Sequence, residues 1–181
     1  MKPNGQLTAE IGEHLRQEFS PKGYDVFYDH GEHAAYVGEI VSSFGEGLQR
    51  ETELSQLDIA VVKHGTEKAY VLIEIEETND EPKTFLADAF GALCGERISF
   101  HGEPLSVGDW TTLIVMGKGS ETHRSRNDFL AHNIRSCQLS LSTANKWIKK
   151  LVIESFDDDT ELEQKVRKHV ETALPREIAI E

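Results

Sequence analysis

The stretch that decides the fold is AYVLIEIEET, residues 69–78, where an apolar run ends in three glutamates. Side chains alternate along a strand. One face would carry Val71, Ile73 and Ile75, and it is a well-formed core face. The other would carry Tyr70, Leu72, Glu74 and Glu76. Because a core does not accept carboxylates without nearby cations, this strand predicts a site as well as a core.

The preceding run, SQLDIAVV at residues 55–62, supplies a further acid, Asp58. The two runs predict a β-hairpin with residues 64–68 as its loop. In that register Lys63 pairs with Ala69, and Asp58 lies directly opposite Glu74. Cross-strand neighbours have Cβ atoms about 5 Å apart, so two or three carboxylates converge at one point of a sheet.

Two interpretations of these carboxylates stay open. Like charges that close repel one another, and a hard divalent cation such as Mg²⁺ or Mn²⁺ would resolve the repulsion with oxygen ligands. Alternatively, Glu74 and Glu76 lie on a solvent-facing side of the sheet and bind nothing.

The rest of the chain predicts helices and strands around this hairpin. Spacing of apolar residues predicts helices over residues 7–19, 81–98, 120–137 and 157–174, with Thr8 as the first N-cap. Strands are predicted over residues 24–28, 110–117 and 149–156, with a helix through residues 147–153 as the alternative to the last. Residues 31–55 fit either a short helix with a glycine-containing loop or extra strands. This order predicts an α/β fold with a mixed central sheet flanked by helices.

Composition limits the class of protein. The 181 residues predict one domain, and Cys94 and Cys137 are predicted to be buried core residues. No apolar run approaches a membrane span of about 20 residues, and no signal peptide is visible, so we expect a cytoplasmic protein. A net charge of −13 argues against a general nucleic-acid binder.

One segment departs from this acidic balance. Residues 118–150 hold seven basic and two acidic residues. They could form a local phosphate-binding surface or simply a solvated one.

With Asp58, Glu74 and this element order, the chain resembles the PD-(D/E)xK phosphodiesterase superfamily, the restriction-endonuclease-like fold. The resemblance covers about residues 7–117, with a helix, a three-strand meander, a helix and a strand. It implies a single domain, residues 1–181, with a C-terminal helical extension at about 119–174. It departs from the family at two positions, because Leu57 replaces a proline and Glu76 replaces the lysine of the motif.

The resemblance also implies a site. Asp58 and Glu74, with the main-chain carbonyl of Ile75, would hold Mg²⁺ or Mn²⁺, and Glu76 would add a ligand or act as a base. Lys83, in the first turn of the next helix, is the candidate substitute for the missing lysine. The first helix offers Glu10 or Glu13 as a further acid, and we favour Glu10.

A metal-dependent nuclease is therefore the first functional hypothesis, with Lys118, Arg124 and Arg126 contacting the nucleic acid, which we expect to be DNA. Such a protein could act as a homodimer. The second hypothesis is a nuclease-fold protein that has lost its chemistry and acts as a binding or regulatory subunit, because Glu76 replaces the lysine. The third is an acidic domain that binds a protein partner through exposed carboxylates.

Overall fold

A computed structural model gives the structure of the chain and describes residues 5–43, 53–77, 82–95, 97–119 and 150–175, with residues 132 and 148. Within these residues, no helix has the length and apolar character needed to cross a membrane.

Five strands form a mixed main sheet in the order β1-β4-β5-β8-β9. The strands are β1 (Tyr24–Tyr28), β4 (Ile59–Lys63), β5 (Ala69–Glu76), β8 (Thr112–Lys118) and β9 (Lys150–Phe156). The first three pair antiparallel, whereas β5, β8 and β9 run parallel. The predicted α/β class with a mixed sheet is confirmed. The segment predicted as either a strand or a helix forms the strand β9, so the helical alternative is wrong.

Four short strands form a second, antiparallel sheet in the order β3-β2-β6-β7. They are β2 (Ile40–Ser43), β3 (Glu53–Leu57), β6 (Arg97–Phe100) and β7 (Glu103–Leu105). The described parts of residues 31–55 thus contain extra strands, one of the two alternatives. The sequence did not predict β6 and β7.

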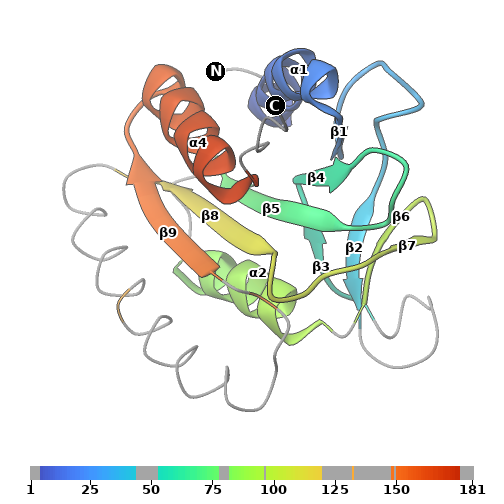
Figure 1. The fold of residues 1–181 in the computed structure, drawn as a ribbon. Coiled ribbons are helices and arrows are strands. Elements are labelled where there is room, and N and C mark those ends of the chain that lie inside the picture. Colours follow the sequence, from blue (N-terminus) through green and yellow to red (C-terminus); the bar gives the residue numbers. More distant parts are fainter. Residues whose placement is uncertain are drawn as a thin grey trace.

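Helices cover both faces of the main sheet (Figure 1). They are α1 (Gln6–Phe19), which continues into a 3₁₀ turn at Ser20–Lys22, α2 (Pro82–Cys94) and α4 (Asp159–Ala173). The view shows α1 and α4 on one side of the sheet and α2 on the other. The helix predicted at residues 120–137 lies outside the described residues, as does Cys137. Cys94, predicted to be buried, is exposed near the end of α2.

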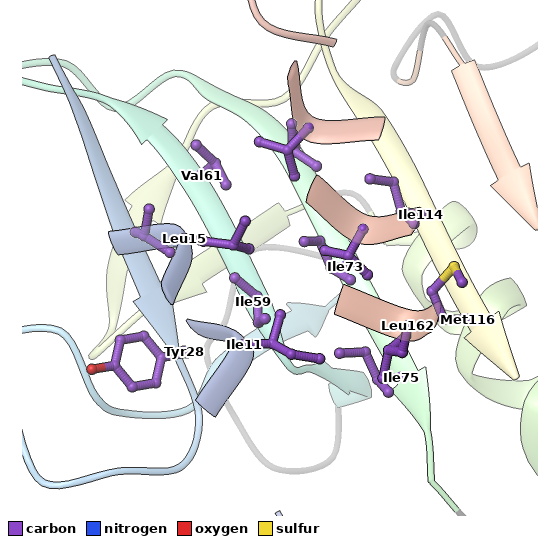
Figure 2. Close-up of a cluster of buried hydrophobic side chains, with 14 of the residues drawn as sticks. Ile11, Leu15, Tyr28, Ile59, Val61, Ile73, Ile75, Ile114, Met116 and Leu162 are labelled. Carbon is purple, nitrogen blue, oxygen red and sulfur yellow. The ribbon is translucent and has the colours of Figure 1, made fainter. Parts of the chain in front are cut away.

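The first core lies between the main sheet and the two helices α1 and α4. The apolar residues of α1, four positions apart, are all buried: Leu7, Ile11, Leu15 and Phe19. It meets the predicted inner face of β5, which consists of Val71, Ile73 and Ile75. Figure 2 shows Ile11 and Leu15 over β4 and β5, and Leu162 of α4 near Met116 of β8. Burial of these apolar side chains is the main stabilising term on this face.

The second core lies on the opposite face, between the main sheet, α2 and the second sheet. It includes Leu72 of β5, Ala60 of β4 and Ile40 of β2. Because β5 is buried on both faces, it reads in sequence as an almost continuous apolar run.

The register of the hairpin differs from the prediction at its loop end. Val61 pairs with Val71, but Val62 pairs with Ala69, so the predicted pairing of Lys63 with Ala69 is wrong. Tyr70 is the extra residue of a β-bulge. It packs on the first core against Tyr24 rather than sharing the face of Leu72, as strict alternation had predicted.

Two other predicted boundaries are wrong. The strand predicted over residues 55–62 is split at Asp58, because β3 belongs to the second sheet and β4 to the main sheet. The N-cap of α1 is Gly5, not Thr8. The segment beyond residue 117, expected as a helical extension, contributes β9 to the main sheet and α4 to the first core.

Candidate functional site

Asp58 is the one residue between β3 and β4, at the point where the chain passes from the second sheet into the main sheet. Its carbonyl oxygen accepts a hydrogen bond from the Asp29 amide at 2.9 Å, and its own amide donates to the Ile73 carbonyl at 3.1 Å. Asp58 is therefore fixed between the end of β1 and the middle of β5.

The Asp58 carboxylate binds the backbone of β5. Its Oδ2 atom accepts a hydrogen bond from the Ile75 amide at 2.5 Å. The paired ladder ends at Ile59 and Ile73, so Asp58 and Glu74 are not a registered pair. Contacts to Ile73 and Ile75 nevertheless place Asp58 beside Glu74, the two acids that the sequence predicted to be neighbours.

Glu74 and Glu76 differ in their surroundings. Glu74 is only 9% exposed, on the face of β5 that Leu72 shares in the second core. The alternative that Glu74 lies on a solvent-facing side of the sheet is therefore wrong. Glu76 is the last residue of β5 and is half-buried, so it lies nearer to the edge of the molecule.

Glu77, the third glutamate, joins β5 to α1. Its Oε1 atom accepts hydrogen bonds from the Thr8 amide at 3.2 Å and the Thr8 hydroxyl at 3.1 Å. Thr8 lies in the first turn of α1, where backbone amides have no partner within the helix. Glu77 thus holds the N-terminus of α1 at the carboxyl end of β5.

The first helix provides two acids with different partners. Glu10 is half-buried and accepts a hydrogen bond from Gln6 at 3.1 Å. Glu13 accepts from Arg16 at 2.7 Å and from the Tyr28 hydroxyl at 3.0 Å, and the Arg16 hydrogen bond lowers the pKa of Glu13 to about 2. Because the Glu13 carboxylate is already paired with Arg16, Glu10 is the better candidate for a metal ligand.

The predicted basic residues are only partly described. Lys118 ends β8 and is half-buried. The backbone of Lys83 lies in the first turn of α2, as predicted, but its side chain lies outside the described part of the chain. Arg124 and Arg126 lie outside it entirely.

Asp29 lies next to Asp58 and is followed by His30, and the sequence did not identify either residue. His30 Nδ1 lies 2.7 Å from Asp29 Oδ1. Burial raises the pKa of Asp29 above its ordinary value, opposed by the hydrogen bond with His30. The available signal was the pair Asp-His directly after the β1 run, but only the pairing of β1 with β4 brings it to Asp58.

Neither a metal-binding cluster nor a similarity to known proteins adds to this candidate site. Among the described residues, no group of three or more histidine, cysteine, aspartate or glutamate side chains is arranged to hold a metal ion. No family model, curated protein or solved structure matches the chain. The geometry around Asp58 is therefore the basis on which a function can be assigned.

Proposed function

We propose that this chain is a divalent-cation-dependent phosphodiesterase that cleaves nucleic acid, with Asp58 and Glu74 as the cation ligands. The observation that carries the proposal is the double attachment of Asp58 to β5, through the Ile73 carbonyl and the Ile75 amide. This attachment holds the backbone of Asp58 next to the segment of β5 that carries Glu74. When the strands of the second sheet are left aside, the elements follow one another as α1, β1, β4, β5, α2 and β8, which is the order that the resemblance to the PD-(D/E)xK superfamily implies.

The donor set fits Mg²⁺ or Mn²⁺ with few protein ligands. Mg²⁺ usually keeps several waters and binds through one or two carboxylates and the substrate phosphate, so a third acidic side chain is not needed. The main-chain carbonyl of Ile75 would be the remaining protein oxygen. A bound cation would polarise the phosphate and make a water molecule more acidic.

The other residues of the site have defined tasks in this proposal. Glu76, at the rim, would add an oxygen ligand or accept a proton, and Glu10 would add a further acid from α1. Lys83 and Lys118 would offset negative charge on the phosphate, and Arg124 and Arg126 would bind the backbone of the nucleic acid. DNA as the substrate and a cytoplasmic location stay predictions.

Metal binding and cleavage test the proposal directly. We expect calorimetry to show stoichiometric Mn²⁺ binding, and we expect cleavage of plasmid DNA, single-stranded DNA or RNA in Mg²⁺ or Mn²⁺. Asp58→Asn and Glu74→Gln should abolish both, because each removes a ligand charge with little change of shape. Asp25→Asn, on β1 and paired with His64, is the matched control and should retain both. Cleavage unchanged by Asp58→Asn would overturn the site.

A second candidate function follows from Glu76. A carboxylate where the family has a lysine removes a positive charge from the transition state, which favours a nuclease-fold subunit that binds or regulates without cleaving. Mn²⁺ binding that is lost in Asp58→Asn, together with no hydrolysis of any nucleic acid, would favour this function. A homodimer or a complex with a protein partner is compatible with either candidate.

A further inference from the structure

Gly91 lies where α2 packs against the second sheet, and it is a buried residue in the interior of the helix. A Cβ atom at this position would lie 2.7 Å from Ser55 Cβ and 2.9 Å from the Leu54 carbonyl oxygen, both on β3. Unbonded atoms do not pack so closely, and the second of these is main chain, so β3 would have to move. Because glycine inside a helix is unfavourable compared with alanine, this close approach is the physical reason for a glycine here.

A buried hydrogen bond joins α2 to the neighbouring strand at the same point. The Ser42 hydroxyl of β2 donates to the Gly91 carbonyl oxygen at 2.9 Å, and Ser42 is fully buried. Ser42 is also the cross-strand partner of Ser55. Gly91 is therefore held against one pair of residues, one from each of two adjacent strands.

The strand that Gly91 contacts leads directly to the proposed cation ligand. β3 continues from Ser55 to Leu57, and Asp58 follows it as the single residue before β4. Leu57 is itself buried in the second core. A shift of β3 at Ser55 would therefore be passed along a short, packed segment to Asp58.

The same helix also packs on the strand of the other proposed ligand. The second core places Ala89 and Ala92 of α2 in one cluster with Leu72 of β5, two residues before Glu74. In the chain, α2 is the next element after β5. It thus contacts both strands that lead to the proposed ligands, β3 before Asp58 and β5 with Glu74.

We infer that Gly91 is a positioning residue of the proposed cation site and acts through β3 on Asp58. This inference rests on the proposed function. The lack of a side chain at Gly91 lets α2 approach β3, and this approach sets the place of Asp58 relative to Glu74. Groups of a binding site must be held within about 0.5 Å of their productive positions, so a small shift of β3 is enough to weaken cation binding.

Mn²⁺ binding to the full chain tests the inference. We expect calorimetry to give a Kd about 10-fold higher for Gly91→Ala than for the wild type, a loss typical of residues that support metal ligands. Ser42→Ala adds no atoms and should raise the Kd by about threefold, the size expected for one lost hydrogen bond. Adding Ser55→Gly to the Gly91→Ala chain removes the nearer contact and should recover part of the affinity.

Val166→Ala separates positioning from a general loss of stability. Val166 lies in α4, on the opposite side of the main sheet from α2 (Figure 1), and it is fully buried in the first core. Its truncation lowers the free energy of unfolding without touching β3, so the Kd for Mn²⁺ should equal that of the wild type. Circular dichroism checks that each variant is folded at the temperature of the titration.

A wild-type Kd in both Gly91→Ala and Ser42→Ala would overturn the inference alone. A rise in Val166→Ala as large as that in Gly91→Ala would also overturn it, because general destabilisation would then explain both. If Gly91→Ala does not fold, the Kd of Ser42→Ala decides. A wild type that binds no Mn²⁺ would overturn the inference together with the proposed cation site.

Discussion

The Asp58 carboxylate has one observed role and one proposed role, and the two can be measured separately. Its carboxylate accepts the hydrogen bond of the Ile75 amide, a role usually filled by a main-chain carbonyl of a paired strand. This lets the chain leave the second sheet and enter the main sheet within one residue. The same carboxylate is the proposed cation ligand, so the choice of substitution decides which task is lost.

We expect Asp58→Ala to lower the free energy of unfolding by about 1–3 kcal/mol, because the Ile75 amide loses its acceptor. Asp58→Asn should cost less, since its amide oxygen can still accept that hydrogen bond. Urea unfolding in EDTA measures both values without a contribution from bound metal. Equal losses in the two variants would show that the charge, rather than the hydrogen bond, stabilises the fold. Asp25→Ala, near the opposite end of β1, controls for removal of an aspartate from the main sheet.

At the scale of elements, each end of β5 makes a contact that positions a neighbouring part of the fold. Near its start, the bulge at Tyr70 moves that ring onto the first core beside Tyr24. Beyond its last residue, Glu77 binds Thr8 of α1. The bond fixes α1, with Glu10 two residues farther on, over the carboxyl end of the strand.

The contact between Glu77 and Thr8 should contribute measurably to stability. We expect Glu77→Gln and Thr8→Val each to lower the free energy of unfolding by about 1–2 kcal/mol, because hydrogen bonds to charged groups are worth about 1.5–3 kcal/mol. A double-mutant cycle in urea should give a coupling energy of at least about 0.5 kcal/mol. Gln6→Ala lies on the same helix turn and binds Glu10 instead, so it should add to Glu77→Gln without coupling. Additive losses for Thr8 and Glu77 would contradict the contact.

The elements that the sequence predicted well are those whose packing repeats along the chain. The four-residue spacing of α1 and the apolar runs of β5 and β8 follow from burial alone. In the second sheet, β6 and β7 were missed because they have four and three residues, too few to show a period. The turn between β6 and β7 was also hard to predict from sequence. Its two residues are His101, with a positive φ of 51°, and Gly102, whereas Asn-Gly is the pair that usually identifies such a turn.

At the scale of the whole molecule, the main sheet separates two cores, and the candidate site lies at one end of this sheet. The proximity of Asp58 to Glu74 could be predicted, because one hairpin joins them. The place of Asp29 and His30 could not, because β2 and β3 intervene in sequence between β1 and β4. When two paired strands are separated by other strands in the sequence, no local sequence pattern predicts their pairing.

Attachment of α4 to the main sheet should make overall stability depend on pH. His169 of α4 has a side chain only 14% exposed, and its Nε2 atom lies 3.1 Å from Glu154 Oε1 on β9. Burial lowers the pKa of His169 below its ordinary value of 6.5, although Glu154 opposes this shift, and Lys150 and Lys168 add to it. The unfolded chain therefore binds a proton more readily than the folded one does.

The sign follows from linkage. The stabilising contribution of neutral His169 is complete above pH 6.5, and it is lost progressively as the pH falls below 6.5 towards the lower pKa of the folded state. Its slope cannot exceed about 1.4 kcal/mol per pH unit, the limit for one proton. Urea unfolding at pH 7.5 and pH 5.5 should show a smaller loss of stability for His169→Gln than for the wild type. His14→Gln, whose more exposed ring pairs with Glu163 of α4, is the matched control. If both variants kept the wild-type pH dependence, protonation of His169 would not contribute to the pH dependence of the free energy of unfolding.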